Sequence, residues 1–158
     1  MGVTFLIVDC DESKPSSHSD NAAIENVALV IGKQGRHEEA DEQLTAALER
    51  ERRLQGNEHS DTLAYERSLA RLRVAEDRFD EALVILERNV AMVRAGSENP
   101  LELADALMLY GEALQGAGRR AESEPVLTEA LALFEAALPD DHRDVASTCE
   151  LIDSPVPG

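Results

Sequence analysis

Tryptophan is absent from this 158-residue chain, and aromatic residues make up only 3% of it. A core without large rings has to be built from Leu, Ala, Val and Ile, which favours helices packed on helices with small residues at the contacts. No apolar run approaches the roughly 18 residues of a membrane-spanning helix. The short apolar stretch at 5–8 has no basic segment before it, unlike a secretion signal. We therefore expect a cytoplasmic protein with no membrane contact.

Basic residues are also scarce, with 15 Lys and Arg against 32 Asp and Glu and a net charge of −17. Nucleic-acid binding depends on cations that displace counterions from phosphates, so this charge balance disfavours nucleic acid as a partner. The same argument applies to anionic membranes.

Cys10 and Cys149 are the only cysteines, and they stand far apart with no CxxC spacing. We interpret them as two reduced thiols of a cytosolic protein. No cofactor motif accompanies them, and we expect no bound cofactor or metal.

What the sequence does contain is an internal repeat. The stretch that begins Gly35-Arg36 returns as Asp77-Arg78 and then as Gly118-Arg119. The arginines are 42 and then 41 positions apart. A period in this range is typical of stacked supersecondary units rather than of a single compact core.

Helical periodicity of apolar residues begins near position 20. We expect a tail or linker at 1–19, a helical repeat domain at 20–152 and a short tail at 153–158. Ser60 or Asp61 is expected to cap the third helix, and Asn99 the fifth, with Pro100 in its first turn. A partial seventh helix at 145–152 is expected to cover the last helix pair.

Aligned copies share small and large residues at fixed positions. The equivalent sets are Ala28, Ala70, Gly111; Ala40, Ala82, Ser123; Ala47, Asn89, Ala130; and the large Leu44, Leu86, Leu127. Small residues allow two helices to approach closely, and leucines fill the space between them.

Over residues 21–138 this pattern resembles the tetratricopeptide repeat, whose usual period is about 34 residues. The longer period and the loop Gly56-Asn57-Glu58-His59, echoed at 139–142, resemble the kinesin-light-chain subtype. The resemblance implies an all-α, right-handed solenoid of about three antiparallel helix pairs. Arg73 stands where a large apolar residue is expected, and Asn89 and Ser123 replace alanines. We expect these departures to weaken the packing, mainly in the middle repeat.

No residue cluster in the chain favours catalysis. His59-Ser60-Asp61 has the residue types of a hydrolase triad, but neighbours in sequence cannot form that relay, so a helix cap is the better interpretation. His37 and Asp41 share a helix face without a third metal ligand. Gly116-Ala117-Gly118 follows a helix and lacks the ending of a phosphate-binding loop. We expect the protein not to be an enzyme.

The resemblance implies that the first helix of each pair lines a concave groove. The residues expected there to contact a partner are Glu25, Leu29, Lys33, Arg67, Arg71, Met108 and Glu112. Lys33, Arg67 and Arg71 are then cations gathered on one face of a very acidic protein. One hypothesis is that they hold a carboxylate-bearing peptide. The alternative is that Arg67 and Arg71 pair with Glu25, Glu112 or Asp105 across the groove.

The leading functional prediction is a non-catalytic protein–protein interaction module or scaffold that binds a peptide or partner helix in this groove. Two alternatives stay open. One is a self-assembling module that forms homo-oligomers through its ends, and the other is a regulatory piece of a larger multidomain signalling protein.

Overall fold

The structure, a computed structural model, describes residues 30 and 34–154. Its helices are α2 (His37–Gln55), α3 (Ser60–Ala75), α4 (Phe79–Gly96), α5 (Pro100–Gly116), α6 (Arg120–Ala137) and α7 (Arg143–Asp153). The residues described contain no strand, and the predicted all-α class is confirmed. The expected N-terminal tail, nearly all of the expected first helix and residues 155–158 lie outside the described residues.

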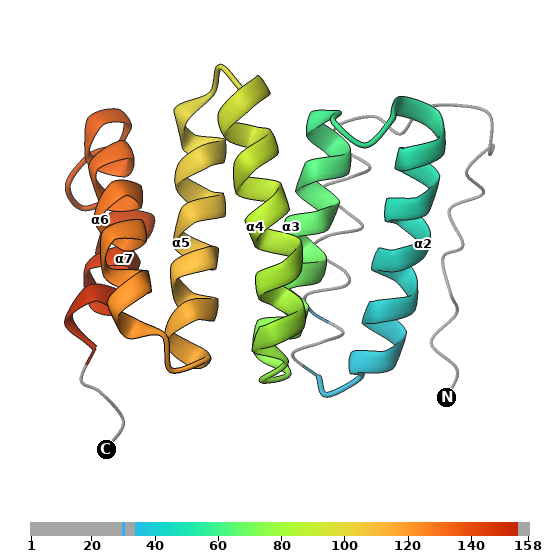
Figure 1. Cartoon of the computed structure of the whole chain (residues 1–158), viewed down its shortest axis with the longest axis horizontal. Coiled ribbons are helices and arrows are strands. Elements are labelled where there is room, and N and C mark those ends of the chain that lie inside the picture. The colour runs from blue at the N-terminus through green and yellow to red at the C-terminus, as the bar shows by residue number, and fades with distance from the viewer. Residues whose placement is uncertain (1–29, 31–33, 155–158) are drawn as a thin grey trace.

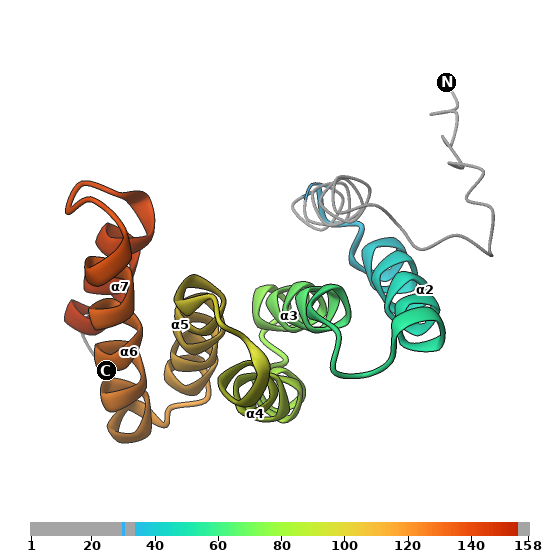
Figure 2. The ribbon, with the colours of Figure 1, turned by 90° about the horizontal axis from the view of Figure 1, so that it is seen from above.

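The helices stand side by side in a row, each running against its neighbour (Figure 1). Seen from above, the row is curved, with α3 and α5 facing its open side and α4 on its outer side (Figure 2). Each helix packs on the next along the chain, and α3 also contacts α5 directly. We call the surface of α3 and α5 on the open side the inner face.

The repeated small and large residues form the contacts predicted for them. The side chains of the alanine, serine and leucine set are all 0% exposed, namely Ala40, Ala82, Ser123, Leu44, Leu86 and Leu127. Gly111 permits a close approach of the paired helices, because a Cβ at that position would overlap the Leu127 side chain. The predicted close packing between paired helices is therefore present in the described pairs.

The recurring arginine stretch forms the turn before each second helix. The residue before the arginine has a positive φ angle in every copy, at Gly35 (78°), Asp77 (59°) and Gly118 (75°). Each arginine then pairs with a glutamate three positions later, as Arg36–Glu39, Arg78–Glu81 and Arg119–Glu122. Hydrogen bonds from the arginines lower the pKa of Glu81 and Glu122. The motif is therefore architectural.

Other helix starts are capped by side chains. Asn99 caps α5 through its Oδ1, which accepts from the amide of Leu101 at 3.1 Å, as predicted. The expected cap of α3 at Ser60 or Asp61 is wrong. His59 caps α3 instead, because its Nδ1 accepts from the amide of Asp61 at 3.2 Å. His142 caps α7 in the same way.

Glu66 of α3 is a buried carboxylate, only 2% exposed, that joins three helices. It accepts hydrogen bonds from Arg52 of α2 at 2.9 Å, from Arg88 of α4, and from Asn89 Nδ2 of α4 at 3.2 Å. A buried carboxylate is costly unless it is paired and hydrogen-bonded, and here donors from both neighbouring helices satisfy it. Asn89 also donates to the backbone carbonyl of Leu63 at 2.8 Å.

Arg73 lies about two helical turns further along α3 and is a second charged side chain with little exposure. Its side chain is 10% exposed. Its nitrogens lie 2.5 Å from Asp41 of α2, 3.3 Å from Glu76 and 3.4 Å from Glu81 of α4. From the repeat pattern, Arg73 and Asn89 were expected to weaken the packing of the middle repeat. In the structure both side chains have pairing partners, and these partners cannot be identified by aligning the repeat copies.

Gly118→Ala tests the turn that precedes α6. We expect it to lower the free energy of unfolding by about 1 kcal/mol, because an L-residue is disfavoured in the left-handed conformation. A Cβ at Gly118 would meet nothing within 4 Å, so conformation alone decides the effect. Gly96→Ala is the matched control, since its Cβ also enters open space but its φ is not positive. Gly96→Ala should raise the free energy of unfolding, measured with urea, by roughly 0.5–1 kcal/mol. Similar losses of stability at both positions would contradict this account.

Asn89→Ala restores the alanine that the repeat pattern favours, yet we expect it to destabilise the protein by about 1–3 kcal/mol. It removes the amide that serves the Leu63 carbonyl and Glu66, both of which are then left short of a donor. Ser123→Ala is the same consensus change at a buried hydroxyl that has no hydrogen-bond partner among the described residues. It should be neutral or stabilising. Chemical unfolding of both variants measures this. A higher free energy of unfolding for Asn89→Ala than for Ser123→Ala would refute the account.

Candidate functional site

The inner face carries a compact charged cluster contributed by α3 and α5. Arg67 and Arg71 lie one turn apart on α3, and Asp105, Met108 and Glu112 follow at helical spacing on α5. These side chains are all half-buried. We call this set the inner-face cluster.

Asp105 bridges the two arginines. Its Oδ2 lies 3.2 Å from Nε of Arg67, and its Oδ1 lies 3.1 Å from Nη2 of Arg71. The side chain of Arg67 is 12% exposed, whereas those of Arg71 and Asp105 are 39% and 36% exposed. Of the pairings that the sequence left open across the groove, the one with Asp105 is therefore present.

Glu112 lies on the same face, where burial removes part of the solvent from its carboxyl group. Burial raises the pKa of its carboxyl, and the positive charge of Arg71 acts against that rise. A carboxylate that is desolvated without full compensation is a feature of binding surfaces as well as of structural ion networks. The inner face therefore includes a carboxyl group whose charged form is disfavoured by burial.

The other predicted contact residues divide into two groups. Glu25, Leu29 and Lys33 lie outside the described residues. Met108 is half-buried and packs against the apolar cluster of α5, α6 and α7 that includes Ala104 and Phe134. The structure therefore brings Arg67 and Arg71 together around Asp105, with Glu112 near enough to Arg71 to be affected by its charge.

The candidate catalytic and metal-binding residues have other partners. His59 caps α3, and Asp41 pairs with Arg73. His37 lies 3.8 Å from Glu76. Within the described part of the chain no three His, Cys, Asp or Glu side chains are grouped to hold a metal ion.

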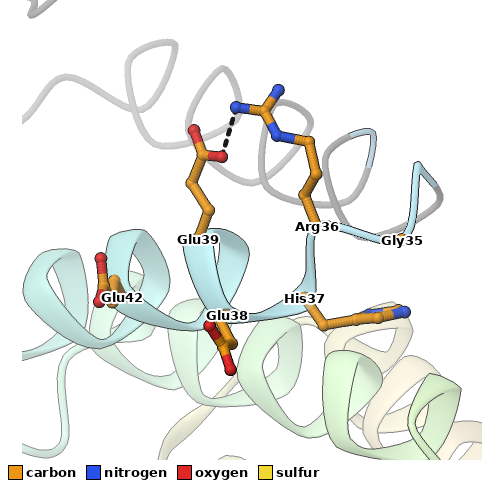
Figure 3. Close-up of a pocket in the computed structure, with 6 residues that line it drawn as sticks. All are labelled: Gly35, Arg36, His37, Glu38, Glu39 and Glu42. Carbon is orange, nitrogen blue, oxygen red and sulfur yellow. Dashed lines mark ion pairs between the residues drawn. The ribbon is translucent and has the colours of Figure 1, made fainter.

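A hollow lies at the start of α2, lined by Gly35, Arg36, His37, Glu38, Glu39 and Glu42. Figure 3 shows that these side chains point in different directions, with Arg36 already paired to Glu39. No convergent set of polar groups is available there for a ligand. The inner-face cluster remains the better candidate.

Sequence reasoning missed the Glu66 cluster and the anchoring of α7. Gln115 donates to the carbonyl of Leu151 at 2.7 Å, and Arg120 donates to that of Ile152 at 2.9 Å, so the last turn of α7 is held by side chains of α5 and α6. A signal for Glu66 was present. Leu63, Glu66, Ala70 and Arg73 form one helical stripe, and two opposite charges within an otherwise apolar stripe indicate buried pairing.

None of the helices described here has the length and hydropathy that spanning a bilayer requires. The comparisons with known proteins concern the repeat itself. Residues 20–95 match a family model described as tetratricopeptide repeat. A comparison with curated proteins gives no match.

Several solved structures are similar to the chain, and two of them illustrate the likeness. One is BtubC (BKLC) from P. vanneervenii, with 22% identity and a TM-score of 0.68, covering 80% of this chain and 52% of that one. The other is a putative kinesin light chain from Podosopora anserina with nearly identical TPR-like repeats, with 19% identity and a TM-score of 0.49, covering 87% of this chain and 86% of that one. The chain thus spans about half the length of BtubC.

The likeness to BtubC shows the fold, a solenoid of paired helices. The family match covers the first two of the three repeats predicted from the sequence. The repeat period of about 42 residues is longer than the usual period of about 34. Residues 20–95 therefore match the tetratricopeptide repeat, and the chain has the fold of a helical-repeat solenoid.

Proposed function

We propose that the protein is a non-catalytic binding module that holds an extended peptide or a partner helix against the inner face of α3 and α5. Stacked helical repeats create extended concave surfaces, and tetratricopeptide repeats generally mediate protein–protein interactions. The observation that carries the proposal is the inner-face cluster, where two arginines share one carboxylate on a protein of net charge −17.

The partner group that suits this cluster is a carboxylate. Arginine presents a planar fork of donors that matches carboxylate geometry, and such charge-assisted hydrogen bonds are the stronger ones in proteins. Salt screens exposed charges beyond roughly 8 Å at physiological ionic strength, so the acidic residues farther away oppose a docked peptide only weakly. Met108 offers an apolar contact beside the charges.

Binding of a library of acidic peptides to the wild type and to the Arg67→Ala/Arg71→Ala variant tests the proposal. We expect the variant to lose at least about tenfold in affinity, since truncating one side of a hydrogen-bonded charge pair costs more than 1.4 kcal/mol. Arg94→Ala is the matched control. It removes an arginine that pairs with Glu129 between the second helices of two repeats, away from the inner face. Equal affinities for the wild type and the double variant would refute the proposal.

Glu112→Gln tests whether the ionised carboxylate of Glu112 destabilises the folded protein. The folded-state pKa of Glu112 is raised, so the native state binds the proton more tightly than the unfolded chain does. This contribution to stability is present below the unfolded pKa near 4.5 and is lost as the pH rises through the folded pKa.

Glu112→Gln should therefore have a higher melting temperature than the wild type at pH 7, with the difference shrinking at pH 4. Thermal unfolding monitored by circular dichroism at both pH values measures this. Glu129→Gln makes the same change of charge on an exposed pair and should show no such pattern. A wild type more stable than Glu112→Gln at pH 7 would contradict the expected sign.

A further inference from the structure

We propose that Asp105 is a built-in competitor of the partner: it occupies the Arg67–Arg71 pair in the free protein and is displaced when a partner carboxylate binds. The inference rests on the proposed function and adds a residue that sets the affinity and selectivity of the inner face. Its basis is the shared geometry, in which each oxygen of one carboxylate meets a different arginine.

The small number of carboxylates around Arg67 and Arg71 favours exchange of Asp105 for a partner carboxylate. Arg67 and Arg71 carry five donors each and share a single carboxylate among the described residues. Arg73 on the same helix meets three carboxylates and is nearly buried. The Arg73 cluster is thus saturated and structural, whereas the two inner-face arginines share one hydrogen-bonded carboxylate and keep further donors that a second carboxylate could use.

The exposure of the three side chains allows the exchange. Arg67 is 12% exposed and is costly to leave without an anion, so a simple opening of the cluster is disfavoured. Asp105 and Arg71 are more than a third exposed, so Asp105 can turn to solvent while Arg71 remains within reach of a partner. Replacing one carboxylate by another keeps Arg67 paired throughout.

Displacement of an internal ligand lowers the apparent affinity for the external one, because part of the binding energy is spent on breaking the internal contact. Asp105 would therefore select partners whose carboxylate is held by additional contacts, such as those with Met108 or the α3 surface. A lone carboxylate would compete poorly.

The test is a titration of the full chain with a blocked pentapeptide that has one central glutamate flanked by leucines, and with its glutamine twin. Asp105→Asn should bind the glutamate peptide about tenfold more tightly than the wild type does, with no change for the glutamine peptide. Glu129→Gln, which makes the same change of charge by breaking the Arg94–Glu129 pair, should bind like the wild type.

The other outcomes separate this inference from the proposed function. If Asp105→Asn and the wild type bind the glutamate peptide equally, or Asp105→Asn binds it less tightly, the competitor role is overturned while the binding face stands. If none of the proteins prefers the glutamate peptide to its glutamine twin, the competitor role and the carboxylate-binding face fail together.

A measurement on the wild type keeps the inference testable if Asp105→Asn folds poorly. The side-chain carboxyl carbon of Asp105, observed by NMR, should change its chemical shift as the glutamate peptide is added and not with the glutamine peptide. A peptide that shifts the Arg67 and Arg71 side-chain signals while that of Asp105 stays constant would overturn the competitor role.

Discussion

The described structure depends on two oppositely charged side chains in the core-facing stripe of α3, each of which pairs with residues of the neighbouring helices. Glu66 takes donors from α2 and α4, and Arg73 takes carboxylates from the same two helices. Because removing either side would leave a buried charge without compensation, α2 and α4 are each fixed in register against α3. The apolar contacts of Leu44, Leu86 and their equivalents hold the helices together. The ion pairs and hydrogen bonds of Glu66 and Arg73 fix the position of α2 and α4 along α3.

The same chemistry has a different consequence on the inner face. Arg73 and Arg67 are both largely buried arginines on one helix, but Arg73 has three carboxylates around it and Arg67 shares one with Arg71. Full pairing makes the first a structural element. Partial pairing beside an aspartate that is more than a third exposed makes the second a surface that can exchange its anion. Burial raises the pKa of the nearby Glu112 carboxyl.

Much of the fold could be predicted, and the reason is periodicity. The spacing of Arg36, Arg78 and Arg119 marked the starts of α2, α4 and α6, and Asn99 with Pro100 marked that of α5. A helix cap was predicted within His59-Ser60-Asp61 but was assigned to Ser60 or Asp61, because histidine is not a common capping residue and only the orientation of its ring shows that Nδ1 accepts an amide. At the candidate site, the two arginines were identified from their place on the helix, but their partner stayed open among three acids.

The sequence by itself determined the repeat, the helices and which residue types occupy each position, because helical periodicity and small-residue spacing are local properties of the chain. Only the tertiary structure decided which charges meet. Glu66 and its donors at Arg52 and Arg88, or Arg67 and Asp105, are 14 to 38 positions apart, and nothing local to either partner specifies the pairing. Whether an arginine stabilises the core or is available to a partner follows from how many carboxylates the packed helices bring within reach of it, and that number exists only once the helices have packed.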